Sequence, residues 1–193
     1  LAKLSAFWDQ DRATWGFWAR WYDGMLHGAP MDWEVQQEVA LIPDEVWTEG
    51  PTAVAREIEK IEAKYDLLSK IENFEGEDTA QVNRRGIGGN NPPTEINDPA
   101  IIREITIIWD VVHDLKEEVQ EETPSKAKIE RLADLLSASL TYLLHLCGRL
   151  GEHALKVGVT LAVTAGGAKI FKPELLEAVI EAAKRFLSSG AAG

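Results

Sequence analysis

The most regular feature of this sequence is a stripe of six aliphatic residues in its second half. They recur at steps of four, three, four, three and four positions: Ile101, Ile105, Ile108, Val112, Leu115 and Val119. This spacing puts the side chains on one face of an α-helix, and an apolar face has to be covered by other helices. Asp98 and Pro99 are typical of an N-cap and a first helical position, and Pro124 ends the pattern. The stripe therefore predicts a long helix that packs in a bundle.

Two further amphipathic segments complete the predicted bundle. The first is apolar at Ile129, Leu132, Leu136, Leu140, Leu143 and Cys147. The second begins at Pro173 and is apolar at Leu176, Val179, Ile180, Ala183 and Leu187. Between them lies a segment of small and apolar residues, 155–171, in which no β-strand is predicted. We expect residues 100–193 to form a bundle of about four helices.

The first half has a different composition. Six of the seven tryptophans lie in the first 47 residues, whereas the rest of the chain uses Leu, Ile, Val and Ala. Asp11 is a plausible N-cap, and Gly28 followed by Pro30 is expected to end the first helix. A second helix is predicted over 32–40. A third, opening at Pro51, has a coiled-coil-like seam made of Val54, Ile58, Ile61, Tyr65 and Leu68. Residues 1–75 are thus predicted to be a Trp-rich helical region.

Residues 76–99 are rich in Gly, Asn and Pro and show no apolar period. Such composition favours turns and interrupts helices. A structureless loop of this length is uncommon inside a compact domain, so we interpret it as a linker or crossover between the two halves. The predicted fold class is accordingly all-α.

Composition and charge limit the function classes. The formal net charge is −12, which repels phosphate backbones and disfavours a nucleic-acid partner. The single cysteine, Cys147, cannot form an intramolecular disulfide. The start of the sequence lacks the pattern of a signal peptide, so we expect a cytoplasmic protein. Leu1 is not a methionine, and we interpret it as the boundary of a fragment of a larger protein.

The loop 84–93 is the most distinctive string in the chain. Arg84, Arg85 and the bare amides of the adjacent glycines suggest an anion site, and Asn90 and Asn91 favour tight turns. The context differs from that of nucleotide-binding loops, because no strand precedes the glycines and no Lys-Ser/Thr pair follows them. A structured linker is the alternative interpretation, and it is the one we favour.

The form RGxGxNNPP of this loop, with the upstream strings FWARWYDGM, MDWEVQQEVALIPDEVW and GPTAVAREIEKIEAKY, carries a resemblance. It resembles an uncharacterised helical region found in otherwise variable alphaproteobacterial proteins. The resemblance covers much of residues 15–120. The position of Gly89 is often histidine in that region, so this chain departs from its commonest form. The resemblance implies no activity.

Two groups of residues could bind metal, and both have a simpler explanation. Asp110, His113, Asp114 and Glu117 share one helical face, but no second helix carries a matching motif, and a solvated face explains them equally. His145 and Cys147 are two positions apart in a predicted helix and point in different directions, so they cannot converge with His153 on one zinc ion. We predict no metal, no cofactor and no catalytic residue.

Two features could instead mediate binding. Trp15, Trp18, Trp21 and Tyr22 follow helical spacing and suit either core packing or a recognition surface. The uncharged segment 157–168 lies in a slightly basic region, which raises the alternative of a membrane-perturbing effector acting through C-terminal apolar helices. It is too short to span a bilayer.

The sequence therefore predicts a non-catalytic helical module of a larger bacterial protein. Its apolar seams would mediate self-association, as in a homo-oligomer, or docking to another domain of the parent protein. A membrane-perturbing segment and an anion-binding or ligand-binding domain using the 84–93 loop are the alternatives.

Overall fold

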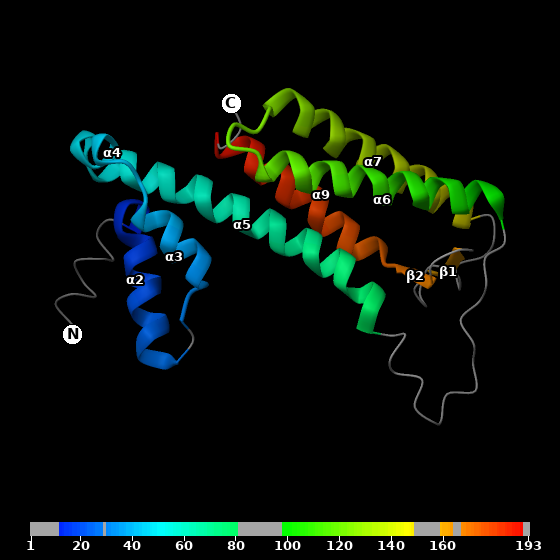
Figure 1. The fold of residues 1–193 in the computed structure, drawn as a ribbon, viewed down its shortest axis with the longest axis horizontal. Helices are drawn as coiled ribbons and strands as arrows, with labels where there is room; N and C mark the ends of the chain where they lie inside the picture. The colour runs from blue at the N-terminus through cyan, green and yellow to red at the C-terminus, as the bar shows by residue number, and fades with distance from the viewer. Residues whose placement is uncertain (1–11, 29, 81–97, 149–158, 164–166, 191–193) are drawn as a thin grey trace. The chain divides into compact units, whose positions relative to one another are not determined.

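The computed structural model describes residues 12–28, 30–80, 98–148, 159–163 and 167–190, and most of these residues are helical (Figure 1). The elements in chain order are α2 (Arg12–His27), α3 (Trp33–Ala40), α4 (Asp44–Glu49), α5 (Pro51–Ala80), α6 (Pro99–Gln120), α7 (Lys126–Gly148), β1 (Val159–Val163), β2 (Gly167–Phe171) and α9 (Pro173–Ser188). The predicted all-α helical fold is confirmed, with one local exception at the two short strands.

The chain forms two compact units that divide between Tyr65 and Asp66, within helix α5. The first unit contains α2, α3, α4 and the start of α5, and the second contains the remainder of α5 with α6, α7, the hairpin and α9. The sequence predicts a linker between the two halves over residues 76–99. Residues 76–80 of that segment are helical as the last part of α5, and residues 81–97 lie outside the described part of the chain.

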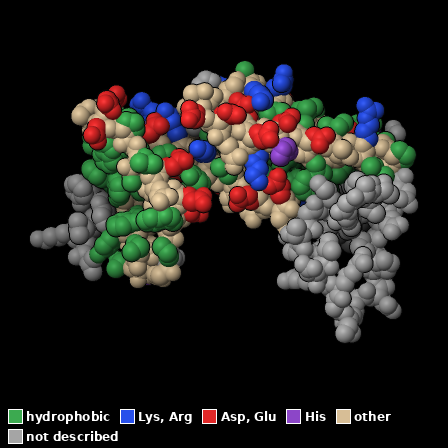
Figure 2. Space-filling model, viewed as in Figure 1, with side chains coloured by type: hydrophobic (Ala, Val, Ile, Leu, Met, Phe, Trp, Pro, Cys, Tyr) green, Lys and Arg blue, Asp and Glu red, His purple; other side chains and the backbone are tan. Residues whose placement is uncertain are grey.

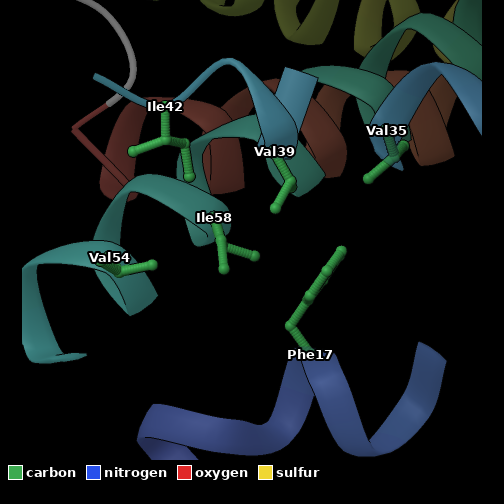
Figure 3. Close-up of a cluster of buried hydrophobic side chains, with 6 residues drawn as sticks. All are labelled: Phe17, Val35, Val39, Ile42, Val54 and Ile58. Carbon is green, nitrogen blue, oxygen red and sulfur yellow. The ribbon is translucent and has the colours of Figure 1, made fainter. Parts of the chain in front are cut away.

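The first unit has a small core of its own. Side chains from α2, from α3, from Ile42 between α3 and α4, and from the first turns of α5 point toward one another (Figure 3). Its buried members are Phe17, Val35, Val39, Ile42, Val54 and Ile58, with Trp18, Met31, Val46, Ile61 and Tyr65 partly buried around them. Packing between four short segments, rather than helix length, therefore stabilises this unit.

Local signals position the short helices of the first unit. The Asp32 carboxylate accepts a hydrogen bond from the Glu34 backbone N–H at 3.0 Å, so Asp32 is the N-cap of α3. Gly50 separates α4 from α5 with a φ of +107°, a conformation that strains residues with a Cβ. Pro51 opens α5, as predicted. The predicted N-cap Asp11 lies outside the described residues.

The second unit is built around the stripe that defines α6. All six stripe residues are at most 1% exposed, which confirms that prediction. Helix α7 packs against both α6 and α9. It buries Ile129, Leu132, Leu136, Leu140 and Leu143, and α9 buries Leu176, Val179, Ile180 and Ala183. Phe186 is the buried residue in the last turns of α9, whereas the predicted Leu187 is only half-buried.

Helix α5 departs from its predicted seam at one position. Val54 and Ile58 are buried and Ile61 and Tyr65 half-buried, but Leu68 is also only half-buried. Leu67 is fully buried in its place, and the buried positions continue with Ile71 and Phe74. The reason is that residues beyond Tyr65 pack into the core of the second unit, which selects its own face of the helix.

The expectation of no β-strand between 155 and 171 is wrong. Strands β1 and β2 form an antiparallel pair, with Val159 opposite Phe171 and Val163 opposite Gly167. β-branched residues at 159, 160, 163 and 170 favour extended backbone. The side chain of Phe171 is fully buried and lies 6.2 Å from Phe74 between ring centres, in an edge-to-face arrangement. That ring attaches the hairpin to the helical core.

Candidate interaction surface

The aromatic residues of α2 are largely engaged within the first unit. Trp15, Trp18, Trp21 and Tyr22 are all half-buried. Trp18 packs edge-on against Phe17, with ring centres 5.1 Å apart, and its ring centre lies 6.4 Å from that of Trp47. The structure thus places Trp18 at the border of the core.

Trp21 connects α2 to α3 through a hydrogen bond. Its indole Nε1–H donates to Gln36 Oε1 at 3.0 Å, and the Gln36 amide nitrogen donates to the Met31 carbonyl at 2.7 Å. This relay orients α3 against α2, because a partly buried indole N–H is satisfied by a side chain that is itself held by the backbone.

Helix α3, together with its C-cap residue Leu41, exposes large apolar side chains on the side that points away from the core. Trp33 is 67% exposed and Leu41 is 78% exposed, and Gln37 and Ala40 between them are exposed as well. We call these four residues the α3 outer face. Figure 2 shows hydrophobic side chains gathered at the surface over the α2 and α3 region of the first unit, with acidic side chains beside them.

The geometry of an α-helix explains why this face cannot be covered by the unit itself. At about 100° per residue, Trp33 and Leu41 lie about 80° apart around the axis of α3. Val35 and Val39 lie about 200° and 240° from Trp33, and both are buried in the core. A helix of eight residues that buries one side in this way leaves the opposite side in solvent.

The segment that carries the α3 outer face is acidic. Residues 31–49, which span α3 and α4, contain six Asp and Glu and no Lys or Arg. Glu34 and Glu38 lie beside Leu41 on the helical wheel, and Asp44, Glu45 and Glu49 are exposed on α4. The surface is therefore an uncharged Trp- and Leu-bearing face with acidic neighbours.

One of these carboxylates is tied to α5. Glu38 Oε1 accepts a hydrogen bond from the Tyr65 hydroxyl at 3.1 Å and lies 3.3 Å from the Lys64 ammonium. Burial, with the hydrogen bond to Glu38, raises the pKa of Tyr65 to about 12. These contacts fix α3 to α5 and hold the outer face in one orientation within the first unit.

The other residues singled out in the sequence do not form a site in the described part of the chain. Arg84, Arg85, Asn90, Asn91 and His153 lie outside the described residues, as does the side chain of Cys147. Asp110, His113, Asp114 and Glu117 are all exposed, and His113 Nε2 lies 3.3 Å from Glu117 Oε1. His145 is exposed on α7.

Within the described ranges, no three His, Cys, Asp or Glu side chains are grouped closely enough to hold a metal ion. No helix among the described residues is long and apolar enough to cross a membrane. The predicted apolar helices of the 157–168 segment are replaced by strand β1 and the first residues of β2 wherever that segment is described.

Comparison with known proteins returns no match: no family model, no curated protein and no solved structure is similar to this chain at a significant level. The geometry of the molecule itself is therefore the basis for assigning its function.

The sequence pattern does not single out Trp33 or Leu41 as functional residues. Most tryptophans lie in the first 47 residues, and their closest spacing is in α2, which draws attention to that helix. The signal for Trp33 was its position opposite the apolar pair at 35 and 39. A helix with apolar residues on two sides can bury one side in its own core, and the other side is then available to a partner.

Proposed function

We propose that this chain is a non-catalytic protein-interaction module and that the α3 outer face is its binding surface. The observation that carries the proposal is the exposure of Trp33 and Leu41 beside a core that is already closed by Val35 and Val39. Tryptophan is enriched among the residues that dominate binding energy at interfaces, and truncation of such a residue costs about 2 kcal/mol or more.

The apolar seams, which the sequence analysis expects to mediate self-association or docking, are not the binding surface that we propose. The stripe on α6 is buried within the second unit, where α7 packs against α6 and α9. A seam that is covered inside its own chain does not require a second copy. Exposed apolar side chains are a better indicator of the binding surface, because a patch of large apolar side chains exposed to solvent is typical of a protein-interaction site.

The described part of the chain offers an internal comparison. Large exposed hydrophobic residues occur in the first unit at Met25, Leu26, Trp33, Leu41 and Trp47, and in the second unit at Leu135 and Tyr142 on α7. Leu135 and Tyr142 are 43% and 49% exposed, less than Trp33 and Leu41. The α7 pair therefore provides a matched control for truncation of exposed apolar residues.

A peptide library displayed on phage and selected on the purified chain tests the proposal. We expect enriched peptides that lose binding to the Trp33→Ala/Leu41→Ala variant by at least about tenfold, equivalent to about 1.4 kcal/mol, and that keep binding to the Leu135→Ala/Tyr142→Ala variant. Far-ultraviolet circular dichroism establishes that both variants are folded. Enriched peptides that bind both variants equally, or no enrichment, would contradict the proposal.

Self-association is the second form that such an interaction could take. Sedimentation equilibrium of the wild-type chain and of the Trp33→Ala/Leu41→Ala variant addresses it directly. A wild-type oligomer that dissociates only in this variant would place the contact between copies at the α3 outer face.

A further inference from the structure

We propose that the α3 outer face binds a cationic amphipathic helix from a different protein, and that a second copy of this chain is not its occupant. The inference rests on the proposed function of this face and adds the chemistry of the partner. It follows from the size of the apolar face, from the sign of the charges around it and from the symmetry that self-association would require.

The apolar part of the face suits a helical partner. At about 1.5 Å per residue, α3 is about 12 Å long, which corresponds to roughly two turns of an opposing helix. Trp33 is the first residue of α3 and Leu41 is its C-cap residue. Around the axis Gln37 lies between them, and the small side chain of Ala40, about 20° from Trp33 on the other side, permits close approach beside the tryptophan. Helices that dock in this way use apolar anchors at spacings of three and four residues.

The charges near the face determine which sign of charge the partner should carry. Every charged residue on α3 and α4 is acidic, and Glu34, Asp44, Glu45 and Glu49 are exposed. On α5, Lys60 Nζ lies 2.9 Å from Glu57, and Lys64 lies 3.3 Å from Glu38, so Lys64 offsets one acidic neighbour of the face while Glu34 and the α4 carboxylates stay exposed. An apolar strip with acidic neighbours is complementary to a helix that carries Lys or Arg beside its own apolar strip.

The same charges disfavour a second copy. In a two-fold symmetric dimer built on this face, the patch of one molecule meets the identical patch of the other. Each copy would bring the acidic residues of 31–49 against the same residues of its partner, and like charges across an interface oppose association. The net charge of −12 acts in the same direction.

The experiment uses two labelled helical peptides of about 14 residues, or four turns, that differ only in charge. One has leucines at helical spacing with lysines elsewhere, and the other has glutamates in place of the lysines. Binding to the full chain is measured by fluorescence anisotropy at low and moderate salt. We expect the Lys/Leu peptide to bind and the Glu/Leu peptide not to bind.

Two pairs of variants distinguish binding at this face from non-specific attraction between a cationic peptide and an acidic protein. We expect Trp33→Ala/Leu41→Ala to weaken Lys/Leu binding by at least about tenfold and Leu135→Ala/Tyr142→Ala to change it by less than about twofold. We expect Glu34→Gln/Asp44→Asn to weaken binding several-fold more than Glu174→Gln/Glu177→Gln. Each of these last two variants removes two exposed carboxylates, the second pair on α9.

Several results would overturn the inference. The first three are an equal loss of Lys/Leu peptide affinity in both charge variants, binding of the Glu/Leu peptide, and absence of Lys/Leu peptide binding. The fourth is a wild-type chain that self-associates and that the Trp33→Ala/Leu41→Ala change dissociates. Binding to zwitterionic phosphatidylcholine vesicles that is lost in the same variant would assign the face to a lipid surface instead. If phage-selected peptides need Trp33 and Leu41 but are not cationic, the inference fails while the proposed function stands.

Discussion

The Lys128 ammonium lies 2.6 Å from the buried Glu118 carboxylate and joins the start of α7 to the end of α6. The other oxygen of the same carboxylate accepts a hydrogen bond from the Ser125 backbone N–H at 2.7 Å. Glu118 is only 6% exposed, although it is a charged residue. It therefore closes the connection between the two helices with both oxygens in use.

Replacement of Glu118 by alanine is expected to destabilise the second unit by about 1–3 kcal/mol. The change leaves the Ser125 N–H without its acceptor and the Lys128 cation without its counterion. Urea unfolding followed by circular dichroism measures the effect. Glu117→Ala is the matched control, because Glu117 is the preceding residue and its side chain is 65% exposed, so its loss should stay within about 0.5 kcal/mol. Equal losses in the two variants would refute a special role for Glu118.

The contribution of Glu118 should disappear in acid. The hydrogen bond from Lys128, with the one from Ser125, holds the pKa of the Glu118 carboxyl below its ordinary value of 4.5. A carboxyl whose pKa is lower in the folded state stabilises the fold above the unfolded pKa and stops doing so as the pH falls through the folded value. We expect the stability difference between wild type and Glu118→Gln to be full above pH 4.5 and to shrink below it. A difference that stays constant over that range would contradict the assignment.

Tyr65 predicts a pH effect of the opposite sign in the first unit. Its pKa is raised from 10.0 to about 12 by burial and by the hydrogen bond that it donates to Glu38. The protonated phenol therefore stabilises the fold below pH 10.0, and this stability is lost as the pH rises toward about 12. Spectrophotometric titration of the phenolate should show one tyrosine ionising late, and Tyr65→Phe should remove that step. Tyr142→Phe is the control, since Tyr142 is 49% exposed.

Phe74 should be among the most costly residues to truncate. It is 1% exposed, and its ring centre lies 4.5 Å from that of Trp109 and 6.2 Å from that of Phe171. We expect Phe74→Ala to destabilise the second unit by about 3–5 kcal/mol, because a large cavity would open where the hairpin meets α5 and α6. Hydrogen exchange measured by mass spectrometry should show lost protection in α6. Leu135→Ala, on an exposed position of α7, should leave that protection unchanged.

Two glycines should respond to alanine with opposite signs. Gly50 has a φ of +107°, so Gly50→Ala is expected to destabilise the first unit by about 1–2 kcal/mol through backbone strain. Gly76 lies inside α5 with nothing near the position of an added Cβ. There alanine should stabilise the helix by about 1 kcal/mol. Thermal unfolding of both variants tests the pair, and the same sign of change in the two would count against this account of α5.

Much of the helical architecture could be predicted from the order of residues. The six-residue stripe of α6, the cap at Asp98 and the first-turn prolines at Pro51 and Pro173 are local patterns, and each appears in the structure as predicted. These signals act within one or two helical turns. They need no knowledge of what the helix will pack against.

Other features depend on contacts between residues far apart in the chain. The sequence alone could not show that α5 changes its buried face after Tyr65, because that choice belongs to the core of each unit. Nor could it show that residues 159–163 and 167–171 pair as antiparallel strands, since a short apolar run suits a strand or a buried helix equally. The packing of Phe171 against Phe74 stabilises the strand pair.

The candidate surface divides in the same way. The sequence by itself determined that residues 32–40 are helical, that Trp33 and Leu41 lie opposite Val35 and Val39, and that the segment carrying them is acidic. Only the tertiary structure decided which of the two apolar sides becomes core. Phe17 and Ile58 pack against Val35 and Val39, so that side of the helix is buried. The side that carries Trp33 and Leu41 stays exposed to solvent. Burial is a property of the packed unit, and no local pattern specifies it.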